Sequence, residues 1–310
     1  MTLQEQIRSN RLRTGVVLLG FAFLVAALVV GVAGLYDPGI AGVVGIAAIA
    51  YGIFSYFSSG KIIAAASGAH PVTKAEQPEL YRAVENAAIG AGLTKTPDVY
   101  IIDDVAPNAF AAGRDPQHAY VAATTGLLAL LDRRELEGVM AHEIAHVRNR
   151  DVRLMSLAAV LVGVIALVSD IVMRMTLFGG GRRREGGLGA IGAIVGIAAL
   201  ILAPIGAALL QMSLSRRREY LADASAVEIS GDPEGLASAL AKLRDDKHPL
   251  KKVTRATAHL YIESPLRDHA GLRSSLGGLF DTHPPLEERI RRLEQMGGFG
   301  LTAPRATDEQ

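Results

Sequence analysis

The chain has 310 residues, of which half are apolar and 20% are charged, and its formal net charge at neutral pH is +1. This apolar content is higher than in ordinary soluble enzymes, and the balanced charge, without a basic patch interleaved with aromatic residues, excludes nucleic acid as an expected partner. The absence of cysteine excludes disulfides, thiolate zinc sites and a cysteine nucleophile. A metal site in this chain must therefore use His, Asp or Glu.

Two long apolar stretches come first, at about 15–35 and about 40–57, separated by a short "YDPG" turn. Each has about the twenty residues that a bilayer core requires, so we expect a transmembrane hairpin within residues 1–57. A signal peptide is the alternative for the first stretch, but its apolar run is too long and a second stretch follows at once. Arginines before the hairpin and lysines after it place both flanks in the cytosol by the positive-inside rule.

Residues 58–153 are expected to form the first part of a cytosolic domain of mixed α and β structure. Its first helix is predicted at "QPELYRAVENAAIGAGL", and two short runs of β-branched and aromatic residues, "PDVYIID" and "HAYVAATTG", predict strands. Asp132 and Glu135 have the spacing of a capping box ahead of a periodic run. This pattern predicts a helix from about Arg133 to at least Asp151.

Two further apolar stretches, at about 154–172 and about 188–210, predict a second apolar hairpin over residues 154–212. If both stretches span, the three arginines at 182–184 lie outside the cell, against the usual charge bias. We expect spanning because of the length of the stretches. The alternatives are a hairpin that lies in the membrane interface or one that packs over the cytosolic domain.

The cytosolic domain is expected to resume over residues 213–300. Asp232 as an N-cap, followed by proline at the first helical position, predicts one helix there, and "PLEERIRRLEQM" predicts another. Residues 301–310 are expected to form a disordered tail.

His142 and His146 are four residues apart on the predicted helix, so their imidazoles project from one face and can share a metal ion. Glu143 could reach a metal-bound water without displacing a ligand, as the general base of an HExxH arrangement. A random order of these residues would produce the motif in roughly one chain in a hundred, so the motif alone does not decide. The alternative is a helix that exposes two histidines and a glutamate.

A catalytic zinc ion requires three protein ligands and an open position for water. The extended pattern HExxHxxGxxH fails because Asn149 stands where that pattern requires glycine. Glu219, in "RRREYLAD", is the best candidate for the third ligand. Asp223, four residues later on the same helical face, would accept a hydrogen bond from a ligand histidine and fix its tautomer. An ordinary ion pair with a neighbouring arginine is the alternative role of Glu219.

Four motifs, "PNAFAAG", "HEIAHVRNRD", "SRRREYLAD" and "THPPLEERI", together resemble the HtpX-like membrane metallopeptidases, relatives of the prenyl-protein-processing zinc proteases. The likeness covers nearly the whole chain. It implies an α+β, mainly α, gluzincin-like zinc metallopeptidase domain with membrane-spanning helical hairpins. It also implies one zinc ion per chain, bound by His142, His146 and Glu219, with Glu143 as the base and Asp223 in support.

The resemblance further implies that an edge segment binds a peptide substrate in extended form, along Asn108, Ala109, Phe110 and Ala111. This agrees with the physics of a free strand edge, whose backbone groups can pair with any sequence. The resemblance also implies that His283 lies near the zinc and stabilises the transition state. A structural histidine that caps the following helix is the alternative.

The predicted function is therefore that of a zinc-dependent endopeptidase in the cell (inner or plasma) membrane, multi-pass, with its catalytic domain in the cytoplasm. It would hydrolyse peptide bonds of membrane or membrane-proximal proteins, in quality control and stress response. Protein substrates and the lipid bilayer are the expected partners. Prenyl-protein processing, a non-catalytic zinc-binding scaffold and a transporter are the alternatives. The sequence determines neither the natural substrates nor the oligomeric state.

Overall fold

The computed structural model of the protein describes residues 38–157, 216–250, 261–262 and 284–301, together with a few single positions before residue 27. Most of the first apolar stretch, most of the second hairpin and most of the tail lie outside these residues, so the predictions for them stay predictions. The domain boundaries drawn from the sequence likewise stay predictions.

A four-stranded sheet of order β1-β2-β4-β3 forms the centre of the domain. Its strands are β1 (His70–Pro71), β2 (Asp98–Ile102), β3 (Ala109–Gly113) and β4 (Ala119–Thr124). The strands β2 and β4 pair in parallel, whereas β1 and β3 run antiparallel to their neighbours. The two predicted strands are confirmed as β2 and β4, and β3 lies at one edge of the sheet.

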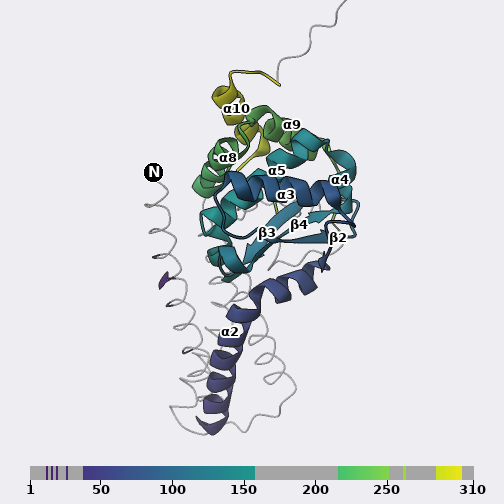
Figure 1. Cartoon of the computed structure of the whole chain (residues 1–310). Helices are drawn as coiled ribbons and strands as arrows, with labels where there is room; N and C mark the ends of the chain where they lie inside the picture. The colour runs from purple at the N-terminus through teal and green to yellow at the C-terminus, as the bar shows by residue number, and fades with distance from the viewer. Residues whose placement is uncertain are drawn as a thin grey trace, which may run out of the picture.

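Both faces of the sheet are covered, because successive strand residues point in opposite directions into two hydrophobic clusters. In β3, Ala109 and Ala111 face the cluster that contains helices α3 (Pro78–Gly90) and α5 (Arg133–Arg148), whereas Phe110 faces the other. Every residue of β3 and β4 is buried. Figure 1 shows α3 and α5 on one side of the sheet and α2 on the other.

The start of α5 confirms the predicted capping box. The Asp132 side chain accepts a hydrogen bond from the Glu135 backbone N–H, and the Glu135 side chain accepts one from the Asp132 N–H. The buried Glu135 carboxylate also accepts hydrogen bonds from Ser238 Oγ (2.7 Å) and Lys242 Nζ (2.6 Å) of α9 (Pro233–Asp245). The same cap therefore starts α5 and fixes α9 beside it.

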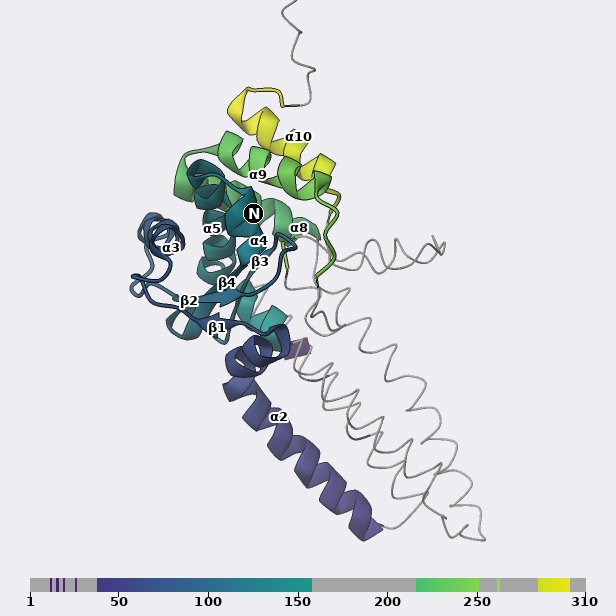
Figure 2. The same ribbon diagram turned by 90° about the vertical axis from the view of Figure 1, so that its right-hand side faces the viewer.

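The C-terminal part of the chain adds α8 (Arg216–Ser230), α9 and α10 (Leu286–Gly297). The predicted cap of α9 is confirmed, since the Asp232 side chain accepts a hydrogen bond from the Gly235 N–H at 3.0 Å. The helix predicted at "PLEERIRRLEQM" is confirmed as α10. Helix α8 packs on α5 and α10 packs on α9, as the turned view in Figure 2 makes visible.

The prediction that the helix of the HExxH motif continues to at least Asp151 is wrong. Helix α5 ends at Arg148, Asn149 is its C-cap, and Arg150 has a φ of 60° before a new helical segment over residues 151–157. A left-handed conformation costs a non-glycine residue roughly 1–2 kcal/mol. The local sequence carries no Gly or Pro to signal the break, which redirects the chain immediately after the motif.

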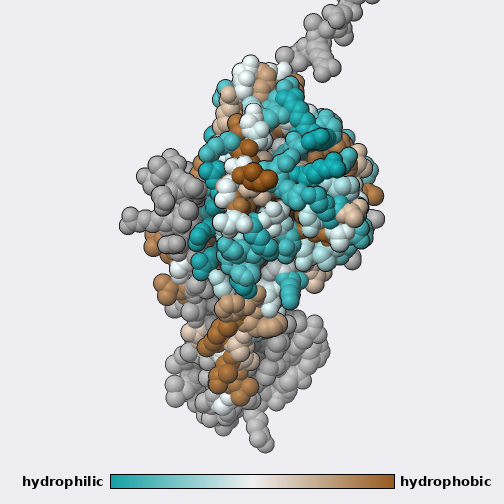
Figure 3. Space-filling model, viewed as in Figure 1, coloured by the Kyte–Doolittle hydropathy of each residue, from teal (hydrophilic) through white to brown (hydrophobic). Residues whose placement is uncertain are grey.

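Helix α2 (Pro38–Ser67) contains the second predicted span and continues beyond it. Among the described helices, none is by itself long and apolar enough to cross a bilayer. One pair, Gly45–Phe54 and Tyr56–Ser67, meets the requirement jointly, with a bend of 74° between its two parts. The first part projects away from the sheet (Figures 1 and 2) and is apolar on its surface (Figure 3). Its large exposed apolar side chains include Ile46, Ile49, Ile53 and Phe54.

Candidate metal centre

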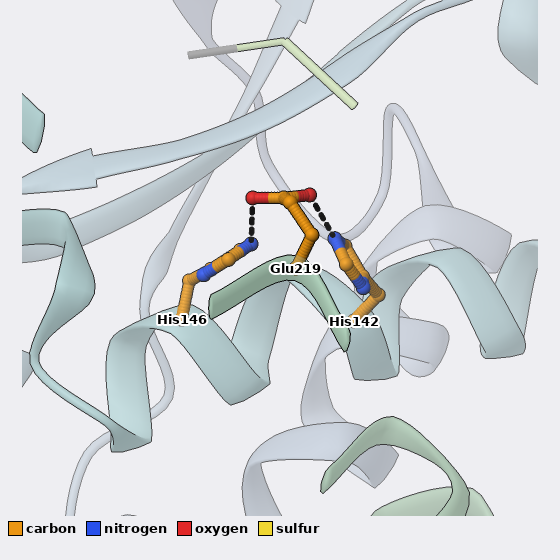
Figure 4. A group of neighbouring side chains, drawn as sticks. All are labelled: His142, His146 and Glu219. Carbon is orange, nitrogen blue, oxygen red and sulfur yellow. Dashed lines mark ion pairs between the residues drawn. The ribbon is translucent and has the colours of Figure 1, made fainter. Parts of the chain in front are cut away.

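Two imidazoles and one carboxylate meet at the centre of the domain (Figure 4). His142 and His146 come from α5 and Glu219 comes from α8, and all three are buried. One donor atom of each lies within 4.8 Å of the other two. The Nε2 atoms of the two histidines are each 3.7 Å from a different oxygen of Glu219, so the carboxylate stands between the two rings.

Helical geometry explains how these side chains meet. His142 and His146 are one turn apart on α5, and their ring centroids are 4.8 Å apart with the planes nearly perpendicular, at 87°. Glu219 and Asp223 are likewise one turn apart on α8, and both reach His142 across the contact between the two helices. The structure thus brings together two segments that are far apart in the sequence.

Each histidine has a second carboxylate behind it. His142 Nδ1 is 3.0 Å from Asp223 Oδ1, and His146 Nδ1 is 3.1 Å from Asp151 Oδ2. A carboxylate acceptor at Nδ1 holds the proton there and leaves the Nε2 lone pair directed toward the shared centre. Both imidazoles are therefore oriented as metal ligands usually are.

The sequence did not reveal Asp151 as a partner of His146. On an unbroken helix a residue five positions later lies about 140° further around the axis, away from the imidazole. The left-handed turn at Arg150 removes this obstacle and returns the Asp151 carboxylate to the histidine. The end of α5 at this turn therefore allows the Asp151 carboxylate to accept a hydrogen bond from His146.

The sequence also did not reveal that Arg289 of α10 belongs to this centre. Its side chain is fully buried and binds Asp223 through two hydrogen bonds, Nε to Oδ2 at 2.9 Å and Nη2 to Oδ1 at 2.7 Å. Its guanidinium also lies 3.3 Å from the ring nitrogens of His142 and 3.7 Å from the Glu219 carboxylate. An arginine on the apolar stripe of α10, between Leu286 and Leu293, was the available signal.

Carboxylates and one arginine set the electrostatics around His142. Burial and the charge of Arg289 act to lower the pKa of His142, but hydrogen bonds to Asp223 and Glu219 outweigh them and raise it to about 9. Burial acts to raise the pKa of Asp223, but the Arg289 charge and the His142 hydrogen bond lower it overall. The carboxylates of Asp223 and Glu219 thus stabilise positive charge at His142, whereas the guanidinium of Arg289 opposes it.

The donor set fits zinc. Zinc takes imidazole nitrogen and carboxylate oxygen, and a catalytic zinc site has three protein ligands with one position left for water. Two imidazole nitrogens and one carboxylate meet these requirements. Glu143 follows His142 on α5 and is 2% exposed, and burial raises the pKa of its carboxyl group. The centre thus holds a possible proton acceptor as well as possible ligands.

The segment expected to bind substrate lies at the edge of the sheet. Ala109, Phe110 and Ala111 belong to β3, which packs against α5. Asn108 precedes the strand and is buried, and its side-chain oxygen accepts a hydrogen bond from the Ala109 N–H at 3.0 Å. His283 lies outside the described residues, so its role stays a prediction.

Comparison with known proteins gives a consistent result. The profile of Peptidase family M48 matches residues 74–297, a range that contains all the residues of the metal centre. A protease HtpX homolog of Limosilactobacillus fermentum is 46% identical over 302 residues, which cover 95% of this chain and 100% of that protein. Homologs bearing the same name in Tropheryma whipplei (47% over 250 residues, 81% and 83%) and Dictyoglomus turgidum (44% over 302 residues, 96% and 95%) are similarly close.

Proposed function

Because the chain belongs to peptidase family M48, we propose that it is a zinc-dependent endopeptidase whose active site is the centre of His142, His146 and Glu219. The observation that carries this proposal is the Glu219 carboxylate between two Nε2 atoms, with a carboxylate behind each ring. A helix that merely exposes two histidines is a poor alternative, because the exposed fractions of both histidines are below 5%. Glu219 also lies near Arg289, so its role as a ligand and its contact with an arginine coexist.

Each residue of the centre has a proposed role in peptide hydrolysis. A bound zinc ion would make its water more acidic and polarise the scissile carbonyl. Glu143 would take the proton from the attacking water and pass it to the leaving amine. A raised pKa makes this carboxylate a stronger base, which suits transfer of a proton from water. His283 is the proposed donor to the developing oxyanion, by the resemblance of "THPP" alone.

The edge of β3 is the proposed binding site for the substrate backbone. Ala109 and Ala111 lie on an edge strand that packs on the helix carrying the metal ligands. An edge strand pairs with an extended peptide through main-chain hydrogen bonds, which do not depend on the peptide's sequence. This geometry supports an endopeptidase of broad specificity, as protein quality control requires.

We further propose that the protein is integral to the cell membrane, multi-pass, with this domain in the cytoplasm. The exposed apolar first part of α2 supports insertion in lipid. At the bend, the guanidinium groups of Arg114 and Arg153 lie 5.7 and 5.9 Å from the rings of Phe57 and Tyr56, respectively. Arginine beside aromatic rings is typical of the membrane–water interface.

The proposed topology predicts which positions an impermeant reagent reaches. The chain has no native cysteine, so single cysteines can be placed at Glu185, between the two last apolar stretches, and at Ile89, which is 76% exposed on α3. In intact cells a membrane-impermeant maleimide should label E185C and leave I89C unlabelled until the cells are lysed. Labelling of I89C in intact cells would contradict a cytoplasmic domain, and protection of E185C would contradict a spanning second hairpin.

Removal of the metal should abolish the proposed activity. We expect the purified full-length protein in detergent to cleave members of a membrane-protein panel with zinc, to lose cleavage after treatment with a chelator, and to recover it when zinc is added back. Cleavage that persists in protein freed of metal, as measured by mass spectrometry of the metal content, would contradict a zinc peptidase. A prenylated peptide belongs in the panel, because cleavage of that substrate alone would favour prenyl-protein processing.

A further inference from the structure

The outer edge of β3 is already partly occupied by another segment of the chain. In an antiparallel strand, the backbone groups of alternate residues point toward the neighbouring strand and away from it. The Asn108 carbonyl accepts a hydrogen bond from Thr124 of β4, so the backbone groups of Ala109, Ala111 and Gly113 point outward. The Ala109 carbonyl accepts a hydrogen bond from the Ile262 N–H at 2.9 Å, at the position that a bound peptide would use.

The other side of Ile262 faces the metal centre. Its carbonyl accepts a hydrogen bond from Arg289 Nη1 at 3.3 Å, and the same guanidinium contacts His142 and Glu219. The backbone of Ile262 therefore links the edge of β3 to Arg289, whose guanidinium contacts two of the proposed zinc ligands. In Figure 4 a short yellow-green piece of chain lies above the three side chains, next to a strand.

The side chains of Tyr261 and Ile262 pack on opposite faces of the sheet, beside β3. The Tyr261 ring packs edge-on against Phe110, with centroids 5.1 Å apart, in the cluster on the α2 face of the sheet. Ile262 enters the opposite cluster, which contains α5. Both are almost completely buried, at 1% and 2% exposure. The two residues form a bend in the chain, and they place one side chain on each face of the sheet at the edge of β3.

We propose that Tyr261 and Ile262 occupy the substrate position on β3, and that a peptide binds by displacing this dipeptide; this inference rests on the proposed function. The dipeptide competes with substrate for the edge of β3, so that only peptides able to displace it bind there. A displacing substrate takes over the same contacts, which are an N–H on the Ala109 carbonyl, a carbonyl on Arg289 and an aromatic ring on Phe110. The substrate class is therefore an extended, unfolded segment that contains an aromatic residue.

Binding can be measured without hydrolysis in the full-length Glu143→Gln chain loaded with zinc. The probe is a fluorescein-labelled peptide of residues 257–266, TAHLYIESPL, followed by anisotropy. Adding Tyr261→Ala to this chain should lower the dissociation constant about tenfold, because the edge is open in a larger fraction of molecules. Tyr81→Ala, which removes a tyrosine from α3, is the matched control and should leave the constant unchanged. Equal or weaker binding by the Tyr261→Ala chain would overturn the proposal.

A second measurement requires no substitution at the dipeptide. In the zinc-loaded Glu143→Gln chain, saturating peptide should accelerate hydrogen exchange at the Ile262 amide, since that amide loses its acceptor on β3. Unchanged or slower exchange would identify residues 261–262 as a fixed part of the sheet and overturn the proposal. Neither measurement depends on cleavage. If the peptide binds as expected but no protein substrate is hydrolysed, the proposed enzymatic function fails while the occupancy of the strand edge stands.

Discussion

A Glu143→Gln chain is expected to keep one zinc ion and to lose peptidase activity by about 10²–10⁴-fold, the usual contribution of a positioned general base. Glutamine preserves the size and burial of the side chain but cannot take the proton from water. The carboxyl group is 2% exposed and lies within the electrostatic influence of His142 and His146. Zinc content by mass spectrometry and kcat/KM on a cleaved membrane protein are the two measurements.

Glu219→Gln is the matched control, because it makes the same chemical change in a residue with a different role. A neutral amide oxygen is a weak zinc donor, so this chain should fall well below one zinc per molecule after dialysis. The two variants then separate loss of the base from loss of a ligand. Undiminished cleavage by a zinc-replete Glu143→Gln chain would remove that residue from the mechanism, and full zinc retention in Glu219→Gln would remove the third ligand.

Truncation of Arg289 is expected to destabilise the fold by about 3–5 kcal/mol, because it leaves the buried Asp223 carboxylate without its charge partner. Arg289 is fully buried and holds both oxygens of Asp223, which in turn binds His142 Nδ1. Loss of such a supporting contact also lowers metal affinity, by about 10–100-fold. Chemical unfolding of the metal-depleted Arg289→Ala protein and zinc titration would measure the two effects.

Two further variants distinguish loss of the Arg289–Asp223 contact from general destabilisation of the core. Arg289→Lys keeps the charge but cannot reproduce the planar two-bond contact, so its stability should lie between the wild-type and Arg289→Ala values. Combining Arg289→Ala with Asp223→Asn should cost less than the sum of the single changes, because the uncompensated charge is then absent. Strict additivity, or an Arg289→Ala loss below about 1 kcal/mol, would show that this pair does not support the centre.

The sequence revealed the parts of this molecule that depend on local interactions. These parts are the capping box of Asp132 and Glu135, the Asp232 cap and the strands β2 and β4. Each was predicted from residues only a few positions apart in the sequence. The pairing of His142 with His146 belongs to the same class, since one helical turn determines it. Such features follow from spacing and propensity alone.

The features that the sequence did not reveal depend on tertiary packing or on backbone strain. The left-handed Arg150 is costly on its own and carries no local signal. Asp151 reaches His146 only because of that turn. Arg289 contacts His142 across 147 residues of sequence, and Ile262 contacts Arg289 across 27, through contacts that no periodicity encodes. Glu219 was identifiable as a candidate because its residue type met a chemical need left open by the motif.

The division of the metal centre between α5 and α8 also determines when the protein can become a peptidase during its synthesis. The ribosome adds His146 before Glu219, and the chain between them includes the last two apolar stretches of the sequence. A nascent chain therefore holds two of the three candidate donor side chains while those stretches are being made. Arg289, which fixes Asp223, is added later still. The candidate ligand set is thus incomplete until the chain has been made through Glu219, and its supporting arginine comes only near the end of synthesis.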